Sequence, residues 1–290
     1  MHDIEYDSFG PWIYEISESH PIPKEFKQCS FLLEKVLLSI KIPRQIERRN
    51  ARPDMPLYDY VVTLYKKHIQ ILERKDQEII ENNYLYENIE CLQNRQVLLN
   101  GNLRIIMSDK VYNLPYNTVS VEIIVRMIQI IRQQYNDGPI LPIMEYREIK
   151  KDLINLSFYF QGIINDEKLN NPGFKIIALQ NERSISSWET GFFRNLLSRI
   201  FGKKLLESLH LSNGNEIMII SRGLSLKRRG QAIYSKETFY VKINKIKDLL
   251  WINDVKNLKL IDLTIVTSNN KYTTTFDKEN ISKINYNQII

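Results

Sequence analysis

A basic, aromatic-rich segment between residues 186 and 204 carries side chains suited to binding another molecule. Ser186 and Glu189 form a capping box, which predicts a helix over residues 187–202. At 100° per residue, its apolar side chains fill one half of the helix and its basic ones the other half. Two lysines follow at the C-terminal end, where the helix dipole favours cations. The candidate binding residues are Trp188, Phe192, Phe193, Arg194, Arg199, Phe201, Lys203 and Lys204.

Three interpretations of this helix remain open. Its apolar face packs on a sheet, as most amphipathic helices do, and this is the favoured one. The same face fits a groove on a partner protein, and its basic, aromatic character also fits an anionic membrane surface. A second basic cluster forms a candidate rim beside it, and its residues are Arg222, Lys227, Arg228 and Arg229.

An arginine-rich loop, Arg44–Arg52, contains four Arg and one Glu. Such a loop is suited to contact the phosphates of nucleic acid or lipid. However, it has no interleaved aromatic residues that would stack on bases. The favoured interpretation is a solvated loop whose arginines pair with nearby carboxylates.

Pro53-Asp54, followed by Glu73-Arg74-Lys75, resembles the PD…ExK arrangement of the metal-dependent nuclease superfamily. In that superfamily two carboxylates hold Mg²⁺ and the lysine polarises the attacking water. The resemblance implies those roles for Asp54, Glu73 and Lys75. The match is loose, because Glu73 and Lys75 fall at a strand end rather than in mid-strand. A nucleic-acid-binding protein or nuclease is therefore the alternative function.

Other chemistries lack a pattern in this chain. The four histidines are scattered, and with ten glycines there is no phosphate-binding loop. The two cysteines, Cys29 and Cys91, match no disulfide framework or metal spacing and favour a reducing cytoplasm. The acidic N-terminus does not resemble a signal peptide, and no apolar run is long enough to span a membrane. We expect no metal and no cofactor, and a small-molecule ligand is disfavoured.

Two stretches have the same plan, Leu103–Tyr116 and Leu263–Phe276. Each is a strand, a polar turn and a second strand, with a tyrosine just after the turn. Turn residues at Asn100–Asn102 and Ser108–Lys110 favour a meander around the first stretch. A binding or scaffolding protein suits such a repeat better than a catalyst does.

Alternation and turn residues predict further strands along the chain. They are Lys35–Ile42, Tyr60–Tyr65, His68–Arg74, Ile79–Glu81, Tyr84–Glu87, Ile89–Arg95, Phe174–Leu179, Glu216–Ile220, Leu224–Lys227, Thr238–Ile243 and Ile246–Ile252. Thr118 or Ser120 is expected to cap a helix over 118–135 that is buried on more than one side. A clean period of three and four predicts another helix over 144–164.

The order of elements from Tyr60 to Tyr135 resembles bacterial PH-like and GRAM-type domains, and Glu216–Ile284 resembles them more weakly. The resemblance implies a β scaffold closed by a helix, which binds anionic headgroups, peptides or proteins. The lipid-binding members carry a basic cluster beside the first hairpin, where this chain has Lys66-Lys67. The spaced Lys and Arg pattern of phosphoinositide binders is absent.

The 290 residues include 43% hydrophobic and 26% charged ones, with a net charge of +6, as expected for a folded protein with no strong demand for an anionic partner. We predict an α+β fold of two tandem PH-like antiparallel β-meander modules joined by a helical middle segment. Residues 1–138 form the first module, and 139–290 hold the helices and the second. The predicted function is a cytoplasmic, non-enzymatic adaptor or scaffold that binds a protein. Peripheral contact with anionic lipid at the inner face of the membrane is secondary, and a nucleic-acid partner is less favoured.

Overall fold

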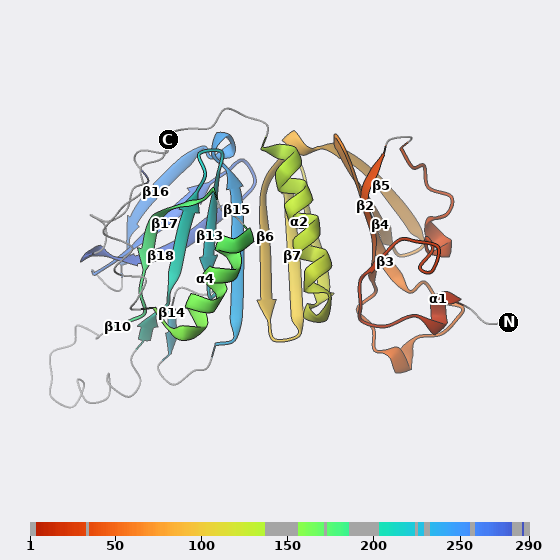
Figure 1. The fold of residues 1–290 in the computed structure, drawn as a ribbon, viewed down its shortest axis with the longest axis horizontal. Coiled ribbons are helices and arrows are strands. Elements are labelled where there is room, and N and C mark those ends of the chain that lie inside the picture. The colour runs from red at the N-terminus through yellow and green to blue at the C-terminus, as the bar shows by residue number, and fades with distance from the viewer. Residues whose placement is uncertain are drawn as a thin grey trace. The chain divides into compact units, whose positions relative to one another are not determined.

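The computed structural model of the protein describes residues 4–32, 35–136, 156–170, 173–185, 203–223, 226–228, 233–255, 259–279 and 286. The chain divides into two compact units, Met1–Asp137 and Gly138–Ile290. In both units the described residues form mainly antiparallel β-sheets, with few helices (Figure 1).

The first unit contains a five-stranded antiparallel sheet followed by a three-stranded meander. The sheet has the order β1-β2-β3-β4-β5, with β1 (Tyr14–Glu15), β2 (Val36–Pro43), β3 (Tyr58–Tyr65), β4 (His68–Lys75) and β5 (Glu78–Leu85). A short turn, η3 (Tyr86–Asn88), leads into the meander of β6 (Ile89–Val97), β7 (Asn100–Met107) and β8 (Val111–Asn117). Helix α2 (Val121–Tyr135) follows the turn η4 (Thr118–Ser120) and packs against β3 and η3.

The N-terminal segment packs on the five-stranded sheet. It contains α1 (Ile4–Asp7) and η1 (Lys24–Phe26), and the loop after β2 contains η2 (Arg48–Asn50). Phe9 and Phe26 are buried in one cluster with Tyr58, Val61 and Leu72 of the sheet. This face of the sheet is therefore buried. The residues of β3 that point to the opposite face, Val62 and Leu64, are buried too, which explains why β3 has near-continuous apolar residues instead of strict alternation.

Helix α2 confirms the predicted helix, but its start differs from the prediction. Ser120 does not cap it, since its hydroxyl accepts a hydrogen bond from the backbone N–H of Ile13 at 3.0 Å. The Thr118 hydroxyl donates to the carbonyl of Leu98. Arg132, a charged residue of the last turn, is buried. Long-range contacts therefore recruit the polar groups that local capping would have used.

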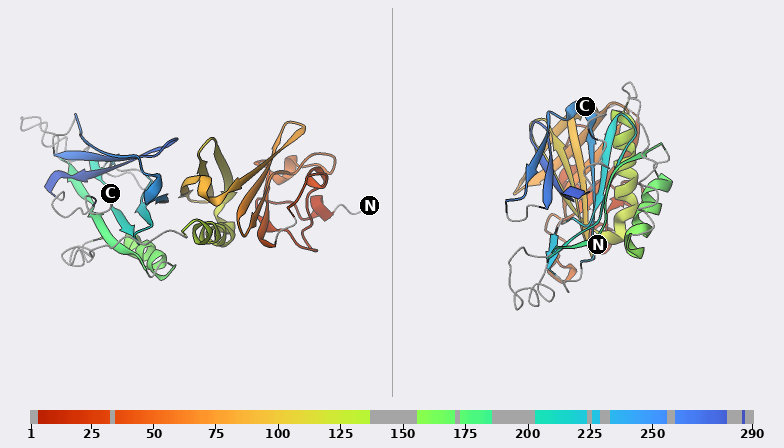
Figure 2. Two further views of the ribbon diagram at one scale, coloured as in Figure 1. Left: turned by 90° about the horizontal axis from the view of Figure 1, so that it is seen from above. Right: turned by 90° about the vertical axis from the view of Figure 1, so that its left-hand side faces the viewer.

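The second unit begins with helix α4 (Phe158–Asn170), followed by three groups of antiparallel strands. The main sheet has the order β9-β12-β13-β15, with β9 (Lys175–Gln180), β12 (Ser208–Ser212), β13 (Glu216–Ser221) and β15 (Ser235–Lys242). Short strands β10 (Arg183–Ile185), β11 (Lys203–Leu205) and β14 (Leu226–Arg228) pair separately. After η6 (Ile243–Lys245) comes the meander of β16 (Asp248–Asn253), β17 (Leu260–Val266) and β18 (Lys271–Asp277). Figure 2 shows α4 and this meander on opposite sides of the main sheet.

The end of each unit has the same plan, in which a short turn (η3 or η6) leads from an antiparallel sheet into a three-stranded meander. The sheets before the turn differ, because the first has five consecutive strands, whereas β10, β11 and β14 interrupt the four main-sheet strands of the second unit in the chain. The hairpins predicted from Leu103–Tyr116 and Leu263–Phe276 are confirmed as β7–β8 and β17–β18. In the first unit α2 follows the meander, whereas Tyr286 is the one described residue beyond Glu279 in the second.

Several predicted boundaries are wrong. Ile79–Glu81 and Tyr84–Leu85 belong to one strand, β5, and the remaining two residues of the second predicted strand lie in η3. Of the helix predicted over 144–164, residues 144–155 lie outside the described part, and α4 begins at Phe158 and continues to Asn170. Strands β10, β11 and β12 were not predicted, since each is short and its pairing comes from distant residues.

The turn predicted at Asn100–Asn102 is also wrong. Val97 pairs directly with Asn100, so the chain reverses at Leu98 and Leu99, and Leu98 has a left-handed φ of 52°. Gly101 lies within β7 instead, opposite Tyr116 of β8. The glycine is required there because the Tyr116 ring lies directly over it.

We expect Gly101→Ala to destabilise the first unit by about 1–3 kcal/mol, the usual cost of overpacking. The new Cβ would lie 2.2 Å from Cζ of Tyr116. That ring cannot move away, because its hydroxyl donates to Asn94 at 2.6 Å and accepts from Gln96 at 3.0 Å. Gly162→Ala in α4 is the control, since a Cβ there meets nothing within 4 Å and should stabilise its helix by about 0.5–1 kcal/mol. Denaturant unfolding checks both; equal stability of Gly101→Ala and wild type would contradict the argument.

Candidate functional site

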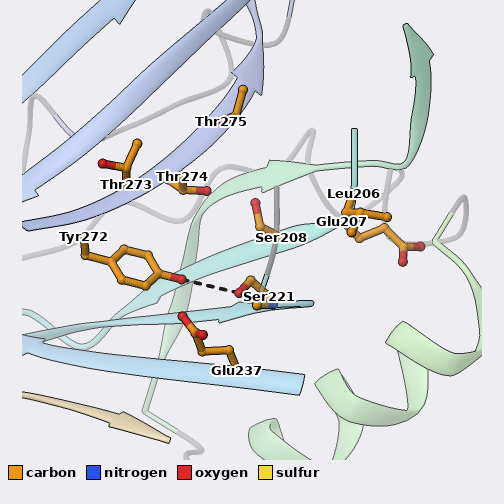
Figure 3. Close-up of a pocket in the computed structure, with 10 residues that line it drawn as sticks. Leu206, Glu207, Ser208, Ser221, Glu237, Tyr272, Thr273, Thr274 and Thr275 are labelled. Atoms are coloured by element: carbon orange, nitrogen blue, oxygen red, sulfur yellow. Dashed lines mark hydrogen bonds between the residues drawn. The ribbon is translucent and has the colours of Figure 1, made fainter. Parts of the chain in front are cut away.

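A small polar cavity lies between the main sheet and the β16–β18 meander of the second unit, and it is the candidate functional site (Figure 3). Its volume of about 60 Å³ leaves room for a few water molecules or one small polar group. Every lining residue except Leu206 and Gly223 carries an oxygen atom in its side chain. The lining residues are Leu206, Glu207, Ser208, Ser221, Gly223, Glu237, Tyr272, Thr273, Thr274 and Thr275.

One wall contains Ser208, Ser221 and Glu237, which belong to a row of polar side chains that crosses four neighbouring strands. Gln180 of β9 pairs with Ser208 of β12, and Ser208 pairs with Ser221 of β13. Ser221 in turn pairs with Glu237 of β15. Directly paired residues point to the same face of a sheet, so these side chains lie side by side. All four are buried.

The polar row ends an otherwise largely apolar inner face. Two residues further along the strands, that face carries the fully buried His210, Ile219 and Phe239. A short apolar strand such as β13 could carry apolar residues at all of its core-facing positions. The row is therefore a local departure from the core pattern, which is expected at functional sites.

Strand β18 forms the opposite wall. The Tyr272 ring stacks on Phe239 with centroids 4.1 Å apart and an interplanar angle of 8°. Its hydroxyl lies 3.4 Å from Oγ of Ser221. Burial raises the pKa of Tyr272, and the neighbouring Glu237 raises it further. Tyr272 therefore stays a neutral phenol and can donate its proton.

Among the described cavity residues, Ser208 has a buried side-chain oxygen without a hydrogen-bond partner. Its Oγ has no hydrogen-bond partner among the described residues, although the residue is 4% exposed. The side chain points toward β18, across the cavity (Figure 3). An unsatisfied buried hydroxyl costs about 1–3 kcal/mol. A polar group that enters the cavity would remove this cost.

Glu207 closes one end of the cavity, and its carboxylate turns away toward α4 (Figure 3). It accepts hydrogen bonds from the backbone N–H of Ser157 at 2.6 Å and the Ser157 hydroxyl at 2.9 Å. Arg222 lies 3.7 Å from the same carboxylate, and its guanidinium stacks over Tyr159 at 4.5 Å. Glu207 thus fixes the start of α4 and is not directed at a ligand.

The arrangement is suited to binding. A nucleophilic serine needs an adjacent base within hydrogen-bond reach. His210 follows Ser208 on the same face, but its Nδ1 is bonded to the hydroxyl of Tyr286 and burial lowers its pKa to about 3. Within the described ranges, no group of three or more His, Cys, Asp or Glu side chains lies close enough to hold a metal ion.

The predicted 187–202 helix lies entirely outside the described residues. Trp188, Phe192, Phe193, Arg194, Arg199 and Phe201 lie outside the described residues. Lys203 and Lys204, placed by the prediction at the end of that helix, belong to strand β11. Lys204 forms an ion pair with Glu182. Both lysines thus lie in a strand that pairs with β10 and β14.

Of the predicted basic rim, the structure describes Arg222, Lys227 and Arg228. Arg222 is buried, where its guanidinium donates to the carbonyl of Ile233, so it was wrongly placed at the surface. Lys227 of β14 lies 3.8 Å from Glu182. Arg228 pairs with Lys203 in the backbone register. Arg229 is outside the described residues.

The arginine-rich loop pairs with carboxylates, as favoured from the sequence. Arg49 forms an ion pair with Glu47, and Arg52 lies 3.7 Å from Asp54. Arg48 stacks over the ring of Tyr6 at 4.0 Å. These three arginine side chains thus contact groups of the protein, whereas a phosphate-binding site would need them to contact phosphate.

Of the three residues of the nuclease alternative, Asp54 has a different partner from Glu73 and Lys75. Asp54 is exposed in the loop beside Arg52. The Glu73 carboxylate accepts from Lys110 at 2.8 Å and from the hydroxyl of Tyr60 at 3.3 Å. Lys75 lies 4.0 Å from Glu73, a weak pairing. Asp54 thus has a partner outside the Glu73–Lys75 pair.

Sequence reasoning missed the cavity residues. Ser208, Ser221, Glu237 and Tyr272 matched no motif, and β12 was not predicted at all. One signal was present: polar and apolar residues alternate over Ser208–Ser212, as in a half-buried strand.

No family model matches the chain, and no curated protein matches its sequence. No helix in the described part of the chain is both long and apolar enough to cross a membrane.

Proposed function

We propose that this protein is a non-enzymatic adaptor that binds another protein, built from two PH-like modules. The PH-like assignment is supported by the short turn and three-stranded meander that follow an antiparallel sheet in each unit. In the first unit α2 follows the last hairpin, as the closing helix of a PH-like domain does. The modules are scaffolds, and the binding site is the cavity of the second one.

The proposed binding role rests on the Ser208 hydroxyl, which has no hydrogen-bond partner among the residues that the structure describes. A β scaffold of this kind has no structural need for a row of buried polar side chains at the end of its core. The cavity is too small to enclose a drug-sized molecule, but it can hold the tip of one side chain. Anchor side chains that enter such pockets dominate the affinity of protein interfaces.

Site-specific photocrosslinking of the full chain tests this role. Thr273 is exposed and lines the cavity, so a benzophenone side chain there should capture a partner protein. The same probe at Val255, which is 92% exposed, is the control and should not capture it. The captured protein is then purified and titrated against the chain by calorimetry.

Ser208→Trp fills the cavity, and we expect it to weaken binding of the captured partner at least about tenfold, equivalent to 1.4 kcal/mol. Retention of the fold is verified by circular dichroism. Recovery of nucleic acid instead of protein, or equal affinity of the variant and wild type, would refute the proposed function.

A further inference from the structure

We propose that the cavity beside Ser208 accepts a primary ammonium group, supplied by a lysine side chain of the bound protein. This inference rests on the proposed function, since it names the chemistry of the group that enters the same site. It follows from the charge of the cavity, the spacing of its acceptors and its size.

Charge selects against anions. Glu237 is 4% exposed and places its carboxylate in the cavity beside the Tyr272 hydroxyl (Figure 3). A phosphate or carboxylate would meet this group at close range in a poorly solvated space, where like charges repel strongly. The nearby cations are directed elsewhere, since Lys236 pairs with Glu167 at 2.9 Å and Arg222 faces Glu207. A cationic or neutral donor therefore suits the site.

The acceptors are spaced for a compact donor. Ser208, Ser221 and Glu237 are directly paired on three neighbouring strands. Neighbouring strands lie about 4.8 Å apart. One nitrogen seated between two adjacent side chains is therefore within hydrogen-bond reach of both. An ammonium group has three donors that rotate to suit, whereas a guanidinium is a rigid planar fork.

The Ser208 hydroxyl oxygen can also accept a hydrogen bond from a donor that enters the cavity. Its neighbour Ser221 already has contacts, because its Oγ accepts the backbone N–H of Gly223 at 3.1 Å and lies near Tyr272. The Ser208 Oγ has lone pairs and, among the described residues, no such contact. An ammonium group would donate to it and to the adjacent Ser221, and its charge would be balanced by the Glu237 carboxylate on the next strand. The volume of about 60 Å³ fits that group and the end of its alkyl stem, but not an aromatic or sugar ring.

The test uses Nα-acetyl-lysine methylamide as a probe for the full folded chain, followed by NMR or calorimetry. We expect saturable binding with a dissociation constant on the order of 1 mM. The Nε-acetylated probe should not bind, because it has lost its charge and two of its three donors. Absence of saturable binding by the lysine probe to folded wild type would overturn the proposal.

Matched variants locate the probe. Glu237→Gln should weaken binding at least about tenfold, and Ser208→Ala about three- to tenfold. Glu78→Gln, an exposed carboxylate on β5 of the first unit, is the control and should bind as wild type does. If Glu237→Gln misfolds, Ser208→Ala alone decides, and unchanged affinity in that variant counts against the site.

The proposed function and this inference can fail separately. If the partner captured from Thr273 binds equally well after its lysines are acetylated, the ammonium site is wrong and the adaptor role stands. If lysine probes bind but no protein is captured, the cavity has the proposed chemistry and the adaptor role fails.

Discussion

Glu207→Ala is expected to lower the free energy of unfolding of the second unit by about 3–5 kcal/mol, the cost of breaking a buried charged pair. Glu207 is 1% exposed and accepts two hydrogen bonds from Ser157 at the start of α4. Its removal leaves the backbone N–H of Ser157 without this acceptor. It also leaves Arg222, 9% exposed, without its nearby carboxylate.

Denaturant unfolding, followed by amide hydrogen exchange in the second unit, measures this loss. Glu207→Gln should lie between wild type and Glu207→Ala, because an amide oxygen keeps one acceptor but not the charge. The double variant Glu207→Ala with Arg222→Leu should recover part of the loss, since the buried cation is then absent. If Arg222→Leu destabilises the Glu207→Ala variant as much as it destabilises wild type, Glu207 and Arg222 are not coupled.

Lowering the pH is expected to destabilise the second unit through His210. The imidazole is fully buried against Phe276, with ring centroids 5.0 Å apart, and this burial lowers its pKa from 6.5 to about 3. Nδ1 of His210 is hydrogen-bonded to the hydroxyl of Tyr286, whose pKa is raised by burial. The other ring nitrogen, Nε2, has no partner within the part of the chain that the structure describes.

The sign of the pH effect follows from which state binds the proton. Above pH 6.5 the imidazole is neutral in both the folded and the unfolded chain, so it contributes no pH dependence. Between pH 6.5 and about 3, the unfolded chain binds a proton that the folded one excludes. The free energy of unfolding therefore falls by about 1.4 kcal/mol per pH unit, or about 2–3 kcal/mol by pH 4.5.

His210→Phe should remove this slope, because the side chain no longer titrates. His68→Gln, at the start of β4 in the first unit, should leave the slope of the second unit unchanged. Stability of wild type and His210→Phe, measured by denaturant titration from pH 7 to pH 4.5, decides the matter. Parallel pH profiles for the two proteins would show that His210 does not cause the effect.

Local periodicity was enough to predict the parts of the fold whose partners are close in sequence. The hairpins over Leu103–Tyr116 and Leu263–Phe276 and the helix ending at Tyr135 form as predicted. In each case a few consecutive residues contain both the alternation and the turn, so distant contacts are not needed to specify them. The turn predicted from the composition of Asn100–Asn102 is wrong. Gly101 lies inside the strand, because the Tyr116 ring leaves no room for a Cβ atom there.

The amino-acid sequence by itself determined the β-rich character of this protein and its repeated hairpins, whereas only the tertiary structure decided the candidate site. Ser208, Ser221, Glu237 and Tyr272 come from four strands, and no local spacing relates them. Their convergence depends on cross-strand register, and a shift by one residue would turn each side chain to the other face. That register is selected by the packing of whole sheets, such as Tyr272 on Phe239, and so it is absent from any short segment of the chain.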